Sequence, residues 1–157
     1  MFEDVAAFTQ LLQGLTHSLK TEFSVLAVDD GSVHNPLPAD ILETQACTGS
    51  IIHLRRNVGH QQAIAIGLHH LSPLLHPNDR VVIMDCDGED RPESIPLLLQ
   101  ELDQGAQDVV VAARGLRTES KSFQVFYAVY KRLFRLLTGG AIGFGNFMAL
   151  KPPAVKR

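Results

Sequence analysis

The chain has 157 residues, of which 45% are hydrophobic and 20% are charged, and its formal net charge at pH 7 is −3. This length suits one domain, which would bury roughly two thirds of the surface that its unfolded form exposes. The composition is ordinary for a globular protein, and the negative charge argues against a general nucleic-acid binder. We therefore expect residues 1–157 to form a single domain with one core.

The cysteines and the apolar runs bear on location. Cys47 and Cys86 have neither CxxC spacing nor the number of a disulfide framework, so a reducing setting fits best. No run approaches the roughly 18 apolar residues of a membrane-spanning helix, and the first residues lack the basic leader and apolar stretch of an export signal. The sequence predicts a cytoplasmic protein without a membrane span.

The N-terminal region is predicted to hold a helix and then a strand that ends in carboxylates. Between residues 3 and 20, apolar side chains recur at steps of three and four, as on one face of an amphipathic helix. Residues 23–28 are a short β-rich run that stops at Asp29 and Asp30. Because an Asp-Gly turn is common after a strand, these aspartates indicate a site only in combination with others.

The next unit is predicted to be a strand, a basic loop and a helix. A loop with two prolines and a weak helix near 39–45 lead into a strand at 50–54. Residues 55–60 form the basic loop, and apolar residues at helical spacing follow from 63 to 71. His60 could reach a phosphate, but a histidine at the start of a helix commonly meets solvent, so we assign it no role.

Residues 81–93 predict a strand, an acidic loop and the start of a helix. Four β-favouring apolar residues lead into four carboxylates within six positions, and Pro92 suits the first turn of a helix. Strand alternation is expected to turn Asp85 and Asp87 to the same side, where two hard oxygen donors can face one cation. With Glu89 nearby, the pattern favours a Mg²⁺ or Mn²⁺ site.

The acidic loop has a second interpretation, a solvated turn that caps a helix at 92–104. The metal site is favoured because acid clusters follow two separate strands. Parallel strands bring their carboxyl ends to one edge of a sheet. We therefore expect Asp29 and Asp30 to lie near Asp85 and Asp87.

The following elements extend the α/β pattern. The helix at 92–104 is expected to end at Gly105, and residues 108–113 form an apolar strand of the kind buried on both faces of a parallel sheet. Arg114 and Arg117 come next, where cations could clamp a diphosphate, although arginines on a surface loop are usually just solvated. Strands that alternate with helices predict a parallel or mixed α/β sheet.

A longer helix is predicted at 121–138, with one aromatic face and one basic face. This combination suits a helix that lies on an anionic membrane surface. A core helix with a solvated basic back would show the same pattern. Glycines then interrupt the helix, and residues 146–150 could form one more strand.

Five segments in order resemble a known family. They are VDDGS (28–32), RNVGHQQAIAIGL (56–68), MDCDGEDRPESIP (84–96), DVVVAARGLR (108–117) and GNFMAL (145–150). They look like the family 2 inverting glycosyltransferases with a GT-A fold, especially the dolichyl-phosphate and polyprenyl-phosphate sugar transferases. The resemblance covers nearly the whole chain from residue 23 onward. It implies a GT-A-like, Rossmann-like, mostly parallel sheet flanked by helices.

The resemblance also implies roles for the site residues. Asp85 and Asp87 would form the Asp-x-Asp motif of the family. Asp87 would hold Mg²⁺ or Mn²⁺ on the donor diphosphate, and Glu89, where relatives often have Gln, would be a second ligand. The residues on the nucleotide would be Asp29, Asp30, Asn57 and Asp85. The catalytic residues would be Asp85, Asp87, Arg114 and Arg117.

The implied activity is that of a hexosyltransferase that uses a nucleotide-sugar donor and a polyprenyl-phosphate or other glycosyl acceptor, with no nucleic acid. A polyprenyl phosphate is already an anionic nucleophile, so a metal and arginines need only neutralise the leaving diphosphate and align the attack. The anomeric configuration would invert. The protein is then expected on the cytoplasmic face of a membrane, with residues 121–138 resting on its anionic surface.

Two departures from the family pattern bear on activity. Relatives begin with an apolar strand that is missing before the first helix here, and they continue well beyond the GNFMAL segment. We therefore expect a partial glycosyltransferase domain that is poorly active alone. A non-catalytic nucleotide-binding remnant is one alternative. A phosphorylatable receiver domain is another, since residues 28–30, Asp85 and Lys151 mimic its motifs, but it explains neither Asp87 nor the segment at 56–68.

Overall fold

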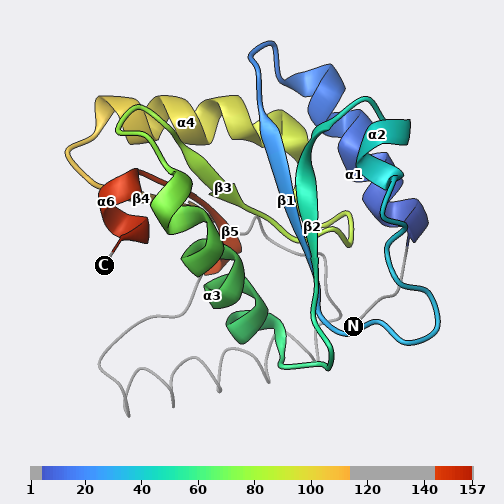
Figure 1. The fold of residues 1–157 in the computed structure, drawn as a ribbon. Coiled ribbons are helices and arrows are strands. Elements are labelled where there is room, and N and C mark those ends of the chain that lie inside the picture. The colour runs from blue at the N-terminus through green and yellow to red at the C-terminus, as the bar shows by residue number, and fades with distance from the viewer. Residues whose placement is uncertain (1–4, 114–143, 157) are drawn as a thin grey trace, which may run out of the picture.

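The computed structural model describes residues 5–113 and 144–156, in which strands lie between helices (Figure 1). The helices and strands are α1 (Val5–Ser18), β1 (Ser24–Asp29), α2 (Ile41–Thr44), β2 (Thr48–His53), α3 (His60–Leu71), β3 (Val81–Ile83), α4 (Ile95–Gln104), β4 (Val109–Ala113), β5 (Phe144–Leu150) and α6 (Pro152–Val155). Short 3-10 helices, η1 (Ser72–Leu74) and η2 (Pro92–Ser94), precede β3 and α4. The predicted alternation of helices and strands is confirmed over these residues.

The described strands form two hydrogen-bonded groups. β1 and β2 run parallel, with Ser24 opposite Thr48 at one end and Asp29 opposite His53 at the other. β5 lies between β3 and β4 and is antiparallel to both, so β3 and β4 share one direction. The α/β class is confirmed: the described strands make one parallel pair and one three-stranded antiparallel sheet, in which β5 runs against its neighbours.

Helices cover both faces of the strands because alternate strand residues point to opposite sides. On β1, Ala27 belongs to a core shared with α1, α2 and α4, whereas Val28 lies against α3 near Gly67. On β5, Phe147 and Ala149 point into the same core as Ala27. The buried helix residues of this core are Phe8, Leu12, Leu15, Ile41, Leu42, Ile95, Leu98 and Leu102. The apolar periodicity of α1 and α4 therefore marks the faces that the fold buries.

The predicted end of the helix at Gly105 is confirmed: Gly105 directly follows α4, and its N–H bonds to the carbonyl of Glu101. Two other expectations are wrong. β3 ends at Ile83, so Asp85 and Asp87 lie in the loop beyond the strand, where strand alternation does not orient them. β4 pairs antiparallel with β5 and leaves Val109 38% exposed, so it is not buried on both faces.

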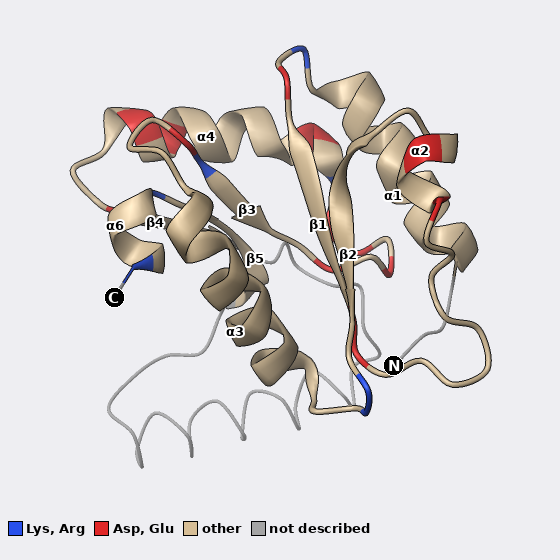
Figure 2. Ribbon diagram, in the orientation of Figure 1, with Lys and Arg blue, Asp and Glu red and all other residues tan. Residues whose placement is uncertain are grey.

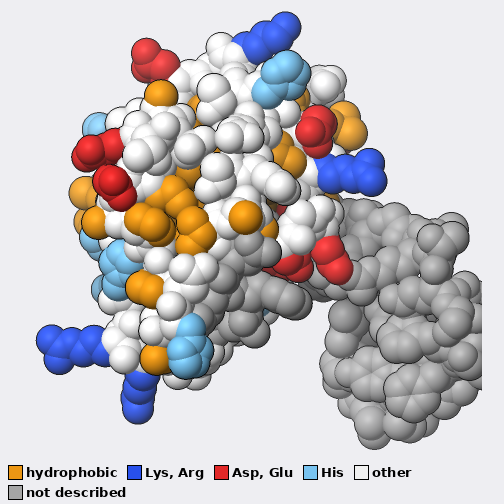
Figure 3. All heavy atoms as spheres, turned by 90° about the vertical axis from the view of Figure 1, so that its right-hand side faces the viewer, with side chains coloured by type: hydrophobic (Ala, Val, Ile, Leu, Met, Phe, Trp, Pro, Cys, Tyr) orange, Lys and Arg blue, Asp and Glu red, His pale blue; other side chains and the backbone are white. Residues whose placement is uncertain are grey.

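The surface on the side of α1 and α2 is mixed in character. Exposed hydrophobic side chains lie near the middle of this face with acidic side chains on either side, and the basic side chains in view stand out at its edges (Figure 3). Over the described ranges, no helix is long and apolar enough to cross a membrane. The amphipathic helix predicted at 121–138 lies outside the described residues.

Candidate active site

The carboxyl ends of β1 and β3 both run into acidic residues (Figure 2), and the start of α3 connects them. Asp30, after β1, accepts hydrogen bonds from the N–H of Val58 at 2.7 Å and from the N–H of Gly59 at 2.9 Å. The next residue, His60, places its Nε2 atom 3.3 Å from the carboxylate of Asp85, in the loop after β3. Residues 58–60 therefore contact an aspartate of each acid cluster, Asp30 on one side and Asp85 on the other.

The carboxylate of Asp29 is buried and accepts hydrogen bonds from its own chain. Asp29 is only 6% exposed, and its two carboxylate oxygens accept hydrogen bonds from the N–H of Ser32 at 3.0 Å and of Leu37 at 3.2 Å. The Nδ1 atom of His53 lies 3.2 Å from the second oxygen. Burial alone would raise the pKa of Asp29, but the hydrogen bonds from Ser32, Leu37 and His53 together hold it below its ordinary value. The ionised carboxylate therefore fixes the loop between β1 and α2.

The turn after β1 packs tightly against the loop before α3. Gly31 has a φ of +74°, which favours glycine, and a Cβ atom there would overlap the backbone of Arg56 and Asn57. Asp30 beside it is 5% exposed, with both oxygens on backbone N–H groups. Asp29 and Asp30, predicted to contact a nucleoside, thus bind backbone of their own chain, while Asn57 is exposed in the neighbouring loop.

The loop after β3 is held in shape by its own carboxylates. Asp90 accepts a hydrogen bond from the N–H of Asp85 at 2.7 Å, and Asp87 accepts one from the N–H of Glu89 at 2.9 Å. Gly88 turns the chain between them with a φ of +83°. The residues that precede η2 and α4 make no side-chain cap hydrogen bond. The loop carboxylates therefore organise the loop, and the structure gives no support to the helix-capping alternative.

The oxygen donors of this loop suit a hard cation. Asp87 and Glu89 are exposed at its tip, while Asp85 is partly buried at its base. Among residues 5–113 and 144–156, no group of three or more His, Cys, Asp or Glu side chains is placed to hold a metal by itself. Mg²⁺ commonly binds through one or two carboxylates together with substrate phosphates and water. The residues present therefore fit a cation that protein and a bound diphosphate hold jointly.

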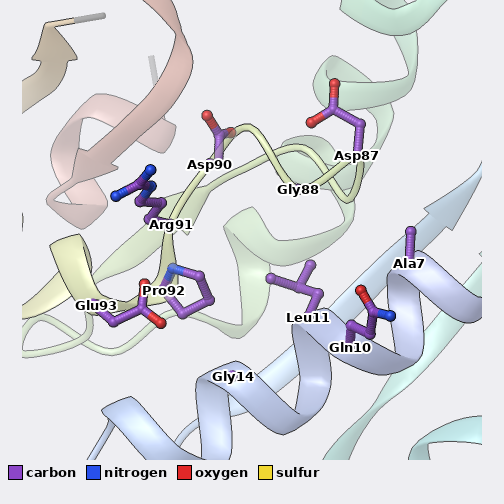
Figure 4. Close-up of a pocket in the computed structure, with 10 residues that line it drawn as sticks. All are labelled: Ala7, Gln10, Leu11, Gly14, Asp87, Gly88, Asp90, Arg91, Pro92 and Glu93. Carbon is purple, nitrogen blue, oxygen red and sulfur yellow. The ribbon is translucent and has the colours of Figure 1, made fainter. Parts of the chain in front are cut away.

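A cavity of about 450 Å³ separates the acidic loop from α1. The lining residues from α1 are Ala7, Gln10, Leu11 and Gly14, and those from the other side are Asp87, Gly88, Asp90, Arg91, Pro92 and Glu93 (Figure 4). The carboxylates of Asp87 and Asp90 point away from α1 in this view. The cavity thus lies between α1 and the loop, with the carboxylates of Asp87 and Asp90 on the side away from α1.

Asn146 of β5 is a residue of the site that the sequence pattern does not indicate, apart from the GNFMAL resemblance. Its Nδ2 atom lies 2.6 Å from Nε2 of His60, and its Oδ1 atom accepts a hydrogen bond from Gln61 at 2.8 Å. His60, to which the sequence alone assigns no role, lies at the site because it directly follows Gly59, whose N–H binds Asp30. Arg114 and Arg117 lie outside the described residues.

These features define an α/β domain with acidic loops at the carboxyl ends of two strands, where such domains bind their ligands. Residues 6–147 match Glycosyl transferase family 2, and the chain belongs to this family. The fold is accordingly GT-A-like, and the family transfers glycosyl groups from nucleotide-sugar donors to acceptors. The match removes the receiver-domain alternative, because it spans most of the chain.

Proposed function

We propose that this chain transfers a hexosyl group from a nucleotide sugar to a polyprenyl phosphate, with inversion at the anomeric carbon. The observation that carries the proposal is the junction at residues 58–60, which contacts Asp30 on one side and Asp85 on the other. A donor bound outside the carboxyl ends of β1 and β3 would extend across both acid clusters.

The carboxylates at the carboxyl ends of β1 and β3 have different roles in this proposal. Asp87 and Glu89 would hold Mg²⁺ or Mn²⁺, and the bound cation would supply positive charge beside the leaving diphosphate. Asp85, partly buried beside α3, orients the nucleoside side of the donor. Asp29 and Asp30 act through the loops that they anchor, and these loops present Asn57 to the nucleotide.

The residues proposed to act on the acceptor, Arg114, Arg117 and the basic face at 121–138, are inferred from the sequence alone. A phosphate nucleophile needs no separate base, so Arg114 and Arg117 suffice to neutralise the acceptor and the leaving group. The basic face at 121–138 would hold the domain on an anionic membrane. Co-sedimentation with vesicles that contain an anionic lipid tests this part. Substituting Lys131, Arg132 and Arg135 with Gln should abolish binding, and undiminished binding would exclude the membrane role.

Metal-dependent nucleotide binding tests the donor side. UDP, GDP and their sugar conjugates are titrated with and without Mn²⁺ while the melting temperature is followed. One nucleoside diphosphate should stabilise the unchanged chain only with Mn²⁺ present, and Asp87→Asn should lose that response. Asp40→Asn, on an exposed aspartate whose side chain makes no cap hydrogen bond, is the matched control. The proposal fails if no nucleotide stabilises the chain under either condition.

A nucleotide-binding domain without turnover is the second candidate. In this candidate Asp29 and Asp30 serve only to hold the loops around the nucleotide, since backbone N–H groups already occupy their oxygens. The test supplies the nucleotide sugar together with a short polyprenyl phosphate. If the chain binds Mn²⁺ and the nucleoside diphosphate but does not release that diphosphate from the nucleotide sugar, this second candidate is correct.

A further inference from the structure

The last residues of β1 and β2, Asp29 and His53, lie opposite each other in the parallel pair. The Nδ1 atom of His53 is 3.2 Å from Oδ2 of Asp29. The side chain of Asp29 is 4% exposed, whereas that of His53 is 44% exposed. A buried carboxylate thus holds an imidazole that is open to solvent at the carboxyl edge of the two strands.

The contact with Asp29 determines which nitrogen of His53 carries the proton. Despite burial, the hydrogen bonds from Ser32, Leu37 and His53 keep the pKa of Asp29 below its ordinary value, so near neutral pH its carboxylate is ionised and only accepts hydrogen bonds. Nδ1 of His53 is therefore the donor, and in the neutral imidazole Nε2 carries a lone pair. Within residues 5–113 and 144–156, Nε2 of His53 has no hydrogen-bond partner. His53 thus presents an oriented acceptor at the surface.

Folding stability does not account for this side chain. Asp29 already accepts the N–H groups of Ser32 and Leu37, and a partly exposed ion pair adds little to stability. An acceptor whose orientation is fixed in advance does favour binding, because a ligand that donates a hydrogen bond to it need not restrict the side chain.

The strand arrangement indicates which part of a nucleotide-sugar donor would reach His53. The diphosphate is proposed to lie at the acidic loop after β3. Figure 1 shows β3 and β2 on opposite sides of β1. A nucleotide that extends from the acidic loop across the carboxyl end of β1 would therefore bring its base, the part furthest from the diphosphate, to the end of β2. The carboxylates of Asp29 and Asp30 already accept backbone N–H groups there, whereas Nε2 of His53 does not.

We propose that Nε2 of neutral His53, oriented by Asp29, accepts a hydrogen bond from the ring N–H of the donor's base. This inference rests on the proposed function. Uracil, thymine and guanine carry a ring N–H on their pairing edge, whereas adenine and cytosine carry a lone pair there. His53 would thus select against ADP and CDP sugars, and Asp29 would act in recognition through His53.

The tautomer is tested first, without ligand. The imidazole nitrogen signals of His53 are recorded by NMR at a pH where histidines are neutral. They should show a protonated Nδ1 and an unprotonated Nε2. His70, an exposed histidine of α3, provides the reference for a solvated imidazole. A proton on Nε2 of His53 would overturn the proposal.

The role in binding is tested by calorimetry with UDP, CDP, GDP and ADP in the presence of Mn²⁺. UDP or GDP should bind more tightly than CDP and ADP. His53→Ala should weaken the better nucleotide about tenfold and reduce its advantage over CDP and ADP. Inorganic diphosphate, which has no base, should bind the unchanged chain and His53→Ala equally well.

Two further substitutions separate the nitrogens of the imidazole. His53→Gln places an amide oxygen near the position of Nε2 and should recover part of the lost affinity. His53→Asn places its amide near the position of Nδ1, so it can donate to Asp29 but offers no acceptor to the base, and it should bind as weakly as His53→Ala. His70→Ala is the matched control and should have no effect.

The outcomes separate this inference from the proposed function. If the unchanged chain binds a nucleoside diphosphate and His53→Ala binds it equally well, the role of His53 is overturned and the proposed function stands. An equal loss for all four nucleotides would indicate a ribose contact, and an equal loss for inorganic diphosphate would place His53 away from the base. Either result would also overturn the inference. If the unchanged chain binds no nucleoside diphosphate, the proposed function and this inference fall together.

Discussion

The carboxylate of Asp30 lies 2.9 Å from the backbone nitrogen of Gly59, the residue that precedes α3. Its other oxygen accepts the N–H of Val58, so one side chain satisfies two donors of a loop that ends at the site. The conformation of that loop therefore depends on Asp30, the residue that directly follows β1. The position of His60, one residue further on, depends on it as well.

Replacing Asp30 with Asn should destabilise the protein by about 1–3 kcal/mol. The amide has one acceptor oxygen where the carboxylate has two, so one buried N–H of Val58 or Gly59 loses its partner. Urea unfolding of the unchanged chain and of Asp30→Asn measures the difference. A loss below about 0.5 kcal/mol would mean that Asp30 does not anchor the loop.

Asp29 should make stability depend on pH in the acid range. Its pKa is lower in the folded state than the ordinary value of 3.8, so its contribution is complete above that value. The contribution is lost as the pH falls through the folded pKa, because the protonated acid turns one of the two oxygens that accept the N–H groups of Ser32 and Leu37 into a hydroxyl and loses the charge that strengthens both bonds.

Thermal unfolding between pH 6 and pH 3 measures this contribution as the difference between Asp29→Asn and the unchanged chain. The destabilisation caused by Asp29→Asn should be largest near pH 6 and should shrink below about pH 4. Asp40→Asn should unfold in parallel with the unchanged chain over the same range. A pH-independent difference for Asp29→Asn would contradict the lowered pKa.

Gly14 sets the distance between α1 and the acidic loop. A Cβ atom at this position would lie 3.1 Å from Cγ of Pro92, at the start of η2. Gly14→Ala should be nearly neutral, since a gain in helix propensity of about 1 kcal/mol offsets the tight contact. Gly14→Leu should cost about 1–3 kcal/mol, because the proline ring must move. Equal stability of the two variants would show that α1 does not support η2.

Glu89 and Asp87 should differ in their effect on Mn²⁺ binding. Glu89→Gln and Asp87→Asn each keep an oxygen donor and lose only a charge, but Asp87 is proposed as the principal ligand. In calorimetry with a nucleoside diphosphate, Asp87→Asn should weaken the metal-dependent affinity by about tenfold or more, and Glu89→Gln by clearly less. The reverse order would exchange the two assignments.

Much of the architecture follows from the sequence, because periodicity records which side of an element is buried. The steps of three and four in α1 and α4 correspond to Leu12 and Leu102, both fully buried. The apolar runs before Asp29 and Asp85 are strands that end at the acid-rich loops. The composition of these loops also predicts oxygen ligands for a hard cation, since this property belongs to the side chains themselves.

Only the tertiary structure decides which groups meet and which way they point. Asn146 and His60 are 86 positions apart, and their contact exists because β5 runs antiparallel beside β3, a pairing that no local pattern specifies. The sequence places Asp29 and Asp30 at the end of a strand, whereas the fold turns both carboxylates inward onto backbone N–H groups. Periodicity indicates which face of a helix or strand is buried. Which side chains contact one another, and which way they point, depends on how segments distant in the sequence pack around the common core.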